Sequence, residues 1–436
     1  MRRLQTAGFE AYWVGGCVRD VLLGREPEDY DVATSARPDE IEALFSRTVP
    51  VGKQFGVMLV VEEDHQFEVA TFRAESDYQD GRHPAQVTFA NAKADALRRD
   101  FTVNGLFYDP IQARTYDWVG GEADLRAKIL RTIGSAEERF AEDHLRLLRS
   151  VRFAAQLGFD LEAETFAALR RNAPKISRVS AERVREELIK LFRPGHAGRG
   201  LELLHESGLL QEILPEISAT VQCEQSTEYH PEGTVFRHLI KMLEQMPPDA
   251  DPALAWAVLL HDVAKPVTFS KDPATGAIHF YGHEKVGADM AEAILRRLKF
   301  PRREIEAVVQ CVLCHMQFKD VPQMRKATVR RMILRPTFPL ELELHRLDCL
   351  GSHGGLEIYD ALVQEAQELH NKPDITPPLI TGSDLIALGM PPGPAMGELL
   401  AQLRDLQLQE ELKTPEQARV WAAAWLKDGQ KLPDNT

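Results

Sequence analysis

Residues that could act together on a phosphate lie close together near the N-terminus, in the stretch YWVGGCVRDVLLGREPEDYDVATS (residues 12–35). A short apolar run ends at Gly15 and Gly16, and a helix-like segment carrying Arg19 follows. A glycine turn that opens a helix exposes backbone N–H groups, which bind anions. We therefore expect Gly16 and Arg19 to contact a phosphate. The alternative is a turn whose glycines meet only a steric need.

An acidic pair, Asp29 and Asp31, follows this turn. In a strand, residues two apart face the same way, about 6.6 Å apart along the chain. Two such carboxylates repel each other without a cation, and they can bind one or two Mg²⁺ ions, which two-metal sites hold roughly 3.5–4 Å apart. We therefore predict a metal site at this pair. The alternative is a solvated loop, since EPEDYD is rich in acidic residues.

Three sequence blocks carry a family resemblance. GGCVRDVLLG followed by DYD resembles the nucleotidyltransferase superfamily that includes DNA polymerase β, and more narrowly the class II tRNA nucleotidyltransferase and bacterial poly(A) polymerase family. RRDFTVNGLFYDP (98–110) and RFAEDHLRLLRSVRFAAQLGF (139–159) follow in the family's order and spacing. The resemblance implies a template-independent enzyme that adds CCA to tRNA 3′ ends from CTP and ATP with Mg²⁺. An A-adding enzyme or poly(A) polymerase with the same catalytic domain is the nearest alternative.

The resemblance also implies roles for residues in the first two blocks. Asp29 and Asp31 would bind the catalytic Mg²⁺ ions. Gly16 and Arg19 would contact the triphosphate, and Arg99 would contact the nucleotide. Asp100 and Asn104 could contact the sugar or fix the local turn. Glu68, in QFEVATF, is a candidate third carboxylate or an exposed strand residue. Residues 74–97 match the family's flexible element at full length, which disfavours an enzyme that adds only CC.

The third block has a regular spacing. On a continuous helix, steps of three residues rotate by about 60°, so Asp143, Arg146 and Arg149 share an arc of about 120°. A carboxylate beside a guanidinium offers the acceptor and donors that reading a base edge requires. The resemblance implies that Asp143 and Arg146 select C or A, with Arg149 and Arg152 as further nucleotide contacts. Ideal geometry turns Arg152 about 180° from Asp143. The alternative is an amphipathic helix with ion pairs.

A histidine-rich region resembles the HD phosphohydrolase domain. Four positions match those that hold a divalent metal in that domain: His238, His261, Asp262 and Asp348. Such ligands suit several divalent ions, so the metal's identity is open. His283 and His315 could be second-site ligands or phosphate contacts. A metal-dependent phosphohydrolase with an inert N-terminal domain is therefore an alternative function of another class, and a non-catalytic RNA-binding protein is a third.

The elements that must position these residues indicate an α+β fold. Strands are expected at 11–15, 57–61, 66–72, 86–90 and 106–108, with a helix after Pro38 capped by Thr34 or Ser35. One continuous helix is expected to end at Gly158, and another to run from Ser180 to Pro194. The expected order is a polymerase-β-like palm with a small mixed sheet (1–133), a helical neck and body (134–225), an HD domain (226–370) and a helical tail (371–436).

Composition limits the class of protein. The chain has 436 residues and a net charge of −14, but residues 121–200 carry 16 Lys/Arg against 12 Asp/Glu, which suits a polyanion such as tRNA. The alternative is solvated helix faces. No apolar run is long enough for a membrane span, and no secretory signal is recognisable. Few residues precede the first expected strand, so a missing N-terminal helix is conceivable. Nothing indicates the oligomeric state.

Five scattered cysteines indicate reduced thiols and a cytoplasmic protein. CVLCH (311–315) matches the pattern for c-type haem attachment. That chemistry takes place after export, and the two cysteines lie in an apolar helical pattern where Cys packs as a small hydrophobe. We therefore expect no haem.

Overall fold

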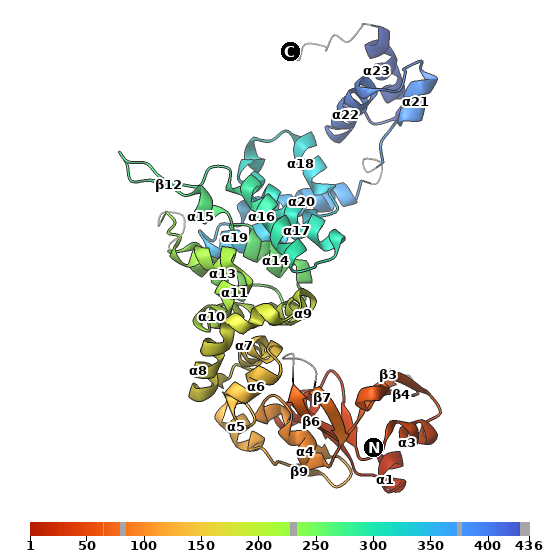
Figure 1. Cartoon of the computed structure of the whole chain (residues 1–436). Coiled ribbons are helices and arrows are strands. Elements are labelled where there is room, and N and C mark those ends of the chain that lie inside the picture. The colour runs from red at the N-terminus through yellow and green to blue at the C-terminus, as the bar shows by residue number, and fades with distance from the viewer. Residues whose placement is uncertain (64, 79–83, 227–232, 373–376, 428–436) are drawn as a thin grey trace. The chain divides into compact units, whose positions relative to one another are not determined.

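The structure is a computed structural model that describes residues 1–63, 65–78, 84–226, 233–372 and 377–427 (Figure 1). The chain divides into two compact units. The first comprises Met1–Ala219 with Arg297–Phe300, and the second comprises Thr220–Arg296 with Pro301–Thr436. The four domain boundaries expected from the sequence stay predictions.

A seven-stranded mixed sheet forms the centre of the first 130 residues. Its order is β3-β4-β5-β2-β1-β8-β9, and only β2 and β5 run parallel among its paired strands. The strands are β1 (Ala11–Val14), β2 (Val32–Thr34), β3 (Thr48–Gly52), β4 (Val57–Glu62), β5 (His65–Thr71), β8 (Phe107–Asp109) and β9 (Arg114–Tyr116). A separate hairpin joins β6 (Arg73–Tyr78) to β7 (Pro84–Phe89). The expected strands are confirmed, and β2, β3, β6 and β9 are additional.

Short helices accompany the sheet: α1 (Arg2–Thr6), α2 (Gly16–Leu22), α3 (Pro38–Leu44), α4 (Ala92–Leu97) and α5 (Gly121–Ala127). Apolar residues of α1, α3 and the strands pack into one buried cluster that includes Leu4, Ile41 and Met58. The predicted cap of α3 is wrong, because Arg37 is its N-cap. Thr34 and Ser35 instead bond to the backbone of Glu10, beside the start of β1.

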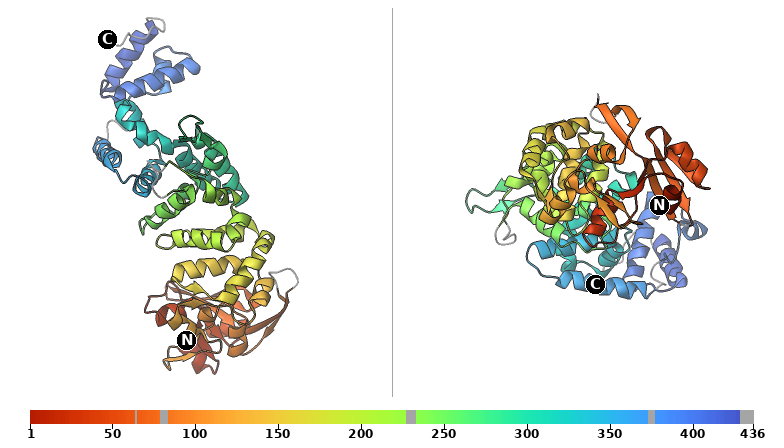
Figure 2. Two further views of the ribbon diagram at one scale, coloured as in Figure 1. Left: turned by 90° about the vertical axis from the view of Figure 1, so that its left-hand side faces the viewer. Right: turned by 90° about the horizontal axis from the view of Figure 1, so that it is seen from below.

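Beyond residue 135 the chain is almost entirely helical, as both views of Figure 2 show. The first unit continues with α6 (Ala136–Glu142), α7 (Leu145–Leu157), α8 (Ala163–Asn172), α9 (Ala181–Leu191), α10 (Ala197–Glu206), α11 (Leu209–Ile213) and α12 (Pro215–Ser218). Gly158 caps α7 in the left-handed region, with a φ of 68°, as expected. Ser180 is the N-cap of α9, which ends at Leu191, short of Pro194.

The prediction of one continuous helix through Asp143 is wrong. The chain breaks between α6 and α7, where Asp143 is extended with φ −142° and ψ 108°. Its carboxylate accepts a hydrogen bond from the backbone N–H of Leu145, 3.0 Å away, and so satisfies one of the free donors at the start of α7. A short polar side chain that bonds the backbone locally competes with helix continuation, which explains the break.

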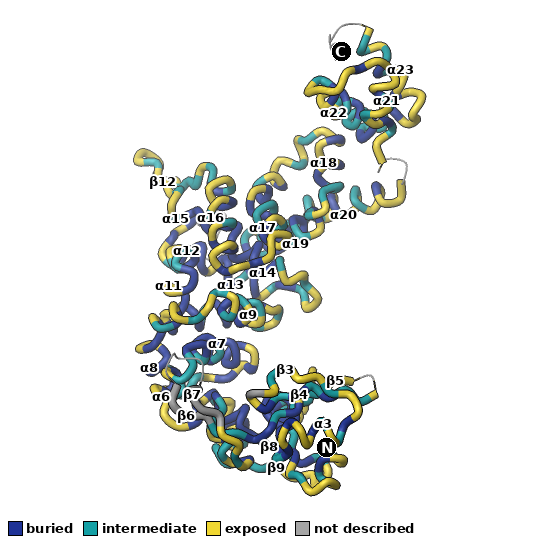
Figure 3. The backbone as a smooth tube through the Cα atoms, turned by 45° about the vertical axis from the view of Figure 1, so that its right-hand side comes forward, coloured by how far each residue is buried: buried dark blue, intermediate teal, exposed yellow. Residues whose placement is uncertain are grey.

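The second unit contains the histidine-rich region. Its helices are α13 (Val235–Glu244), α14 (Pro252–Leu260), α15 (Lys265–Thr268), α16 (His283–Arg297), α17 (Arg302–Cys314), α18 (Lys326–Ile333), α19 (Phe338–Gly351) and α20 (Glu357–His370), and a hairpin joins β12 (Ser270–Lys271) to β13 (Ile278–His279). Residues 254–260 of α14 are all buried, as the dark blue of Figure 3 shows. A helix that is apolar all round lies inside the core.

The C-terminal helices have a core of their own. α21 (Gly382–Ala387), α22 (Pro394–Leu408) and α23 (Pro415–Lys427) enclose Ile380, Leu385 and Leu399. The Pro-rich segment before them lies partly outside the described residues, at 373–376. None of the helices in the described ranges has the length and apolar character that crossing a bilayer requires.

Candidate functional site

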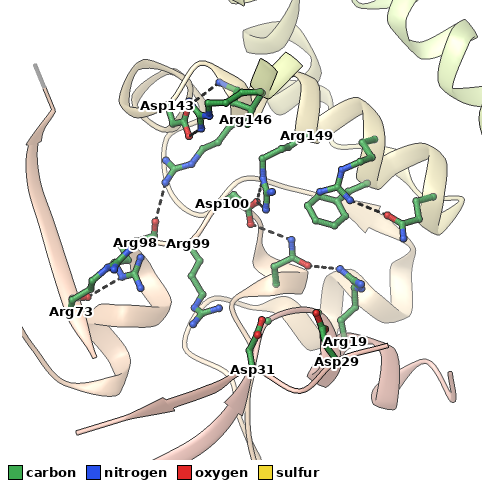
Figure 4. A pocket seen from close by; sticks show the side chains of 18 of the residues that line it. Arg19, Asp29, Asp31, Arg73, Arg98, Arg99, Asp100, Asp143, Arg146 and Arg149 are labelled. Carbon is green, nitrogen blue, oxygen red and sulfur yellow. Dashed lines mark hydrogen bonds and ion pairs between the residues drawn. The ribbon is translucent and has the colours of Figure 1, made fainter. Parts of the chain in front are cut away.

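A pocket of about 670 Å³ in the first unit brings the three sequence blocks together (Figure 4). Its walls come from the turn before α2, the segment before β2, the region around residue 100, the start of α7, and α9. The candidate third carboxylate, Glu68, does not line it. Nine residues proposed for nucleotide or catalytic metal do line it: Gly16, Arg19, Asp29, Asp31, Arg99, Asp143, Arg146, Arg149 and Arg152. Residues more than a hundred positions apart in the sequence therefore face one cavity.

The glycine turn at the start of α2 forms one wall of the pocket. Gly15 has a φ of 75°, which favours glycine, and a Cβ there would lie 3.2 Å from a terminal nitrogen of Arg99. Arg99 donates to Asp95 at 3.0 Å, and its Nε is buried without a hydrogen-bond partner among the described residues. Arg19 donates twice to Asp20, at 2.9 Å each, and once to Asn104 at 2.7 Å. Both guanidinium groups are therefore held in fixed directions at the turn.

The acidic pair lies in extended chain just before β2, not inside a strand as predicted. The backbone carbonyl of Asp31 still accepts from the N–H of Val14, 3.1 Å away. Parallel pairing of Val32 with Val69 places Asp31 beside Glu68 on the adjacent strand. Burial raises the pKa of Asp31 to about 6, and the charges of Asp29 and Glu68 add to the shift. Three carboxylates whose mutual repulsion raises a pKa form a donor set that fits a divalent cation.

Asp100 and Asn104 connect two arginines of the pocket. One oxygen of the buried Asp100 carboxylate accepts two hydrogen bonds from Arg149, at 2.9 and 2.7 Å. The other accepts from the Asn104 amide at 3.2 Å, and the Asn104 carbonyl accepts from Arg19. Although burial alone would raise the pKa of Asp100, Arg149 lowers it to about 2. These contacts favour the interpretation that Asp100 and Asn104 fix the local structure, and with it Arg19 and Arg149, over a direct contact with the sugar.

Phe153, on α7, is surrounded by three guanidinium groups. The guanidinium carbons of Arg19, Arg149 and Arg152 lie 5.4, 5.1 and 3.9 Å from the centre of its ring. The negative face of an aromatic ring attracts cations, so Phe153 can hold like charges together that would otherwise repel. The charge is also balanced by Glu187, which lies 2.5 Å from Arg152 and 3.6 Å from Arg149. Neither Phe153 nor Glu187 was predicted from the sequence.

Asp143 and Arg146 both line the pocket, and each is held by hydrogen bonds to different partners. Arg183, on α9, donates to both carboxylate oxygens of Asp143, at 3.2 and 2.7 Å. Arg146 donates to the backbone carbonyls of Arg139 and Arg98, at 3.1 and 3.2 Å. Sequence reasoning missed Arg183, although it lies in the helix SAERVREELIKL that was recognised as an element. Each half of the predicted base-reading pair is thus fixed from a different direction.

Two groups of metal-ligating side chains lie in the second unit. The first comprises His238, His261 and Asp348, and the second comprises Asp262, His283 and His315; in each group the ligand atoms lie within 4.8 Å of one another. The sequence predicted one site formed by His238, His261, Asp262 and Asp348. The structure instead places Asp262 in the second group. His238 Nε2 lies 3.0 Å from Asp348, and all of these side chains except Asp348 are buried. Lys265 donates to Asp262 at 2.6 Å.

The CVLCH segment also contributes to this region. Cys311 and Cys314 are buried in α17, and burial raises the pKa of both thiols. The histidine of the segment, His315, belongs to the second group of ligands. Burial and the neighbouring His261 lower the pKa of His315 to about 3, which keeps its ring neutral.

Three family models match successive parts of the chain. Residues 11–131 match the poly A polymerase head domain, residues 158–220 a probable RNA and SrmB-binding site of polymerase A, and residues 228–345 the HD domain. The CCA-adding enzyme of Streptococcus mutans is 34% identical over 424 residues, covering 96% of this chain and 94% of the relative. That of Streptococcus pyogenes serotype M3 is 34% identical over 92% of this chain and 90% of the relative.

Solved structures of CCA-adding enzymes also resemble this chain along nearly its whole length. The Bacillus stearothermophilus CCA-adding enzyme in complex with CTP has a TM-score of 0.75 at 27% identity, with 98% of this chain and 96% of that chain covered. The Thermotoga maritima CCA-adding enzyme complexed with tRNA shares the fold, with a TM-score of 0.55 at 18% identity over 97% of this chain and 93% of that one. The motifs, the shared pocket and similarity along nearly the whole length show that this chain belongs to the family of CCA-adding nucleotidyltransferases.

Proposed function

We propose that this chain is a template-independent tRNA nucleotidyltransferase that adds CMP, CMP and AMP to tRNA 3′ ends, using CTP and ATP. One observation supports the proposal above all: a single pocket has Asp29 and Asp31 on one wall, and Asp143 with Arg146 on another. Groups that can bind a metal and groups that can read a base therefore act on one nucleotide. The names of the relatives point to the same activity.

Asp29 and Asp31, with Glu68 beside them, are the residues that would hold Mg²⁺. Carboxylate oxygens are the donors this hard cation takes. Burial, together with the charges of Asp29 and Glu68, raises the pKa of Asp31, and a bound cation would offset that negative charge. When bound, Mg²⁺ makes the attacking 3′-hydroxyl more acidic and neutralises charge on the departing pyrophosphate. Arg19 and Arg99, already oriented by carboxylates, would bind the triphosphate and align its α-phosphate with that hydroxyl.

Base choice would rest on Asp143 and Arg146. Cytosine and adenine both present an amino group at the base edge where uracil and guanine present a carbonyl oxygen. A carboxylate accepts from the amino group and repels the carbonyl, so Asp143 would favour C and A over U and G. Arg146 supplies the complementary donors. This selection needs no template strand.

The tRNA acceptor arm would bind chiefly through its phosphates. α8 and the segment after it carry exposed Arg170, Arg171 and Arg178, which suit phosphate contacts that position RNA without reading its sequence. We place the protein in the cytoplasm, where its five buried thiols would stay reduced.

The experiment is an extension assay with tRNA transcripts that lack CCA, CA or A, each incubated with CTP, ATP, UTP or GTP alone. We expect CTP to extend the first two transcripts and ATP to extend only the third efficiently. Incorporation of ATP alone would replace the proposal by an A-adding enzyme, and long A tails on any RNA would replace it by a poly(A) polymerase. Asp29→Ala with Asp31→Ala is the matched inactive control.

A second candidate function is metal-dependent phosphoester hydrolysis in the second unit. It is supported by the two groups of buried ligands and by a pocket of about 1030 Å³ that reaches Asp262, His283, His315 and Asp348. Hydrolysis of bis(p-nitrophenyl) phosphate that survives Asp29→Ala with Asp31→Ala, and disappears in His261→Ala, would assign this activity to the second unit.

A further inference from the structure

The pocket of the first unit contains an aromatic ring to which the proposed metal and triphosphate contacts give no role. Phe55 ends the 3-10 helix η1 (Lys53–Phe55), between β3 and β4, and lines the same pocket as the acidic pair. Phe55 is 40% exposed. Among the described residues that line the pocket, the other aromatic side chain is Phe153, and three guanidinium groups already surround that ring. Phe55 is therefore the aromatic ring that a ligand in the pocket can reach.

The sheet fixes where this ring lies relative to the acidic pair. The carbonyl of Gly56, which follows Phe55, accepts from the backbone N–H of Thr71, 2.8 Å away at the end of β5. Thr71 is paired with Thr34 at the end of β2, whereas Asp31 comes directly before the start of β2. Three residues of strand span about 10 Å. The Phe55 turn and the acidic pair therefore lie at opposite ends of β2 and face one pocket.

Two arginines and a second exposed ring accompany Phe55. Arg73, which also lines the pocket, donates to the Phe55 carbonyl at 2.7 Å. Phe89, 45% exposed, lies so close to Gly56 that a Cβ there would be 3.2 Å from its ring, and the Arg37 guanidinium carbon lies 5.6 Å from the ring centre. We call Phe55, Phe89, Arg37 and Arg73 the aromatic rim. Rings interleaved with cations suit single-stranded nucleic acid, because the rings stack on bases and the cations attract phosphates.

The direction of nucleotidyl transfer indicates which part of an RNA would reach the aromatic rim. The attacking and leaving oxygens lie roughly in line, so the attacking hydroxyl enters from the side opposite the departing pyrophosphate. Figure 4 shows Arg19 and Arg73 on opposite sides of Arg99. Arg19 lies beside the glycine turn proposed for the triphosphate, so the side of Arg73 is left for the strand that carries the hydroxyl.

From this geometry we propose that the Phe55 ring stacks on the 3′-terminal base of the RNA being extended, while the rest of the aromatic rim contacts the unpaired nucleotides before it. The identity of that RNA as tRNA rests on the proposed function, but the stacking itself requires neither CTP nor ATP. Every base has a face that can stack, so this contact tolerates any sequence. One ring can therefore hold each of the successive 3′ ends that CCA addition creates.

A double-mutant cycle between protein and RNA tests the stacking. A fluorescently labelled tRNA that lacks only the final A is made with a normal or an abasic 3′-terminal nucleotide, and its binding to the full-length protein is measured by anisotropy without CTP or ATP. We expect loss of the base to weaken binding to the parent about tenfold, but binding to Phe55→Leu less than about twofold. Phe55→Trp should keep the sensitivity of the parent. Phe269→Leu, at a similarly exposed ring (44%) of the second unit, is the matched control and should also keep it.

Equal losses from the abasic end in the parent and in Phe55→Leu would overturn the proposal. So would an abasic end that binds the parent as tightly as the normal one, whatever the variants do. CTP binding without RNA, measured by equilibrium dialysis, should be the same in the parent and in Phe55→Leu; weaker binding in the variant would assign the ring to the incoming nucleotide instead. Failure of the parent to incorporate CTP or ATP would contradict the proposed function and leave this result standing, because the RNA titration contains no nucleotide.

Discussion

Arg183 and Asp143 form a two-pronged ion pair, in which one guanidinium donates to both carboxylate oxygens at 3.2 and 2.7 Å. The pair joins α9 to the break between α6 and α7. It fixes the plane of the carboxylate that would accept from the base. We infer that Arg183 acts on base choice through Asp143, as a positioning residue.

Arg183→Gln tests this role. Hydrogen bonds to charged groups contribute about 1.5–3 kcal/mol, so we expect kcat/KM for the correct nucleotide to fall about tenfold or more and UTP incorporation to rise. Arg183→Lys should restore part of the discrimination. Lys190→Gln removes an exposed cation from the same helix and should change neither measurement. Equal losses for all four nucleotides would mean that Arg183 only stabilises the fold.

Phe153→Leu should weaken triphosphate binding although no charge is removed. Each desolvated cation–ring contact contributes about 0.5–2 kcal/mol, and three arginines share this ring. We expect the KM for both CTP and ATP to rise about tenfold, with a smaller effect on kcat, and Phe153→Tyr to retain most of the affinity. Phe159→Leu, at a buried position that does not line the pocket, controls for lost core volume. Similar KM values in the two leucine variants would refute the prediction.

Asp31→Asn should stabilise the metal-free protein at alkaline pH. The pKa of Asp31 is about 6 in the folded state against 3.8 in the unfolded reference, so the folded state binds more protons between these values. Stability contributed by this group is therefore present at low pH and lost as pH rises through about 6. In EDTA at pH 8 we expect the asparagine variant to melt a few degrees above the parent, with little difference at pH 4.

Mg²⁺ supplies the complementary measurement for the same substitution. The cation should raise the melting temperature of the parent at pH 8 and have much less effect on Asp31→Asn. A variant that melts lower than the parent at pH 8 in EDTA would contradict the prediction.

Gly351→Ala should lower metal content in the second unit. A Cβ at this position would lie 3.0 Å from a ring carbon of His238 and 2.9 Å from the side chain of Met242, so the histidine must shift. We expect weaker binding of one metal ion in dialysis experiments and unchanged CTP addition. Gly397→Ala, inside α22 with open space around it, is the control and should leave metal content unchanged. Unaltered metal affinity in Gly351→Ala would show that His238 tolerates displacement.

The sequence predicted which residues gather at the pocket better than how they are held there. Asp29 and Asp31 were predicted from their spacing and charge, and Arg99 and Asp143 from family resemblance, and the structure brings all four together. Arg183 and Phe153 were not predicted as site residues, because their roles depend on the packing of α7 against α9. No local sequence pattern indicates that packing. The three-residue strand β2 was too short to recognise, so the acidic pair was assigned to a strand that it only precedes.

The break at Asp143 was missed for a related reason. AEDHLRLL contains neither Gly nor Pro, so propensity and periodicity both favour a continuous helix. Contacts with Leu145 and Arg183 outweigh that local preference. The first block was easier to interpret, because a glycine turn and an acidic pair can be recognised directly in the sequence.

Because of that break, the direction of the Asp143 carboxylate depends on α9 as well as on α7. This carboxylate is bonded both to the N–H of Leu145 at the start of α7 and to Arg183 on α9, whereas Arg146 and Arg149 are carried by α7 alone. A displacement of α9 relative to α7 would therefore move the carboxylate with respect to Arg146 and Arg149. The distance between the acceptor and the donors that face the base would then change although α7 itself stays as it is.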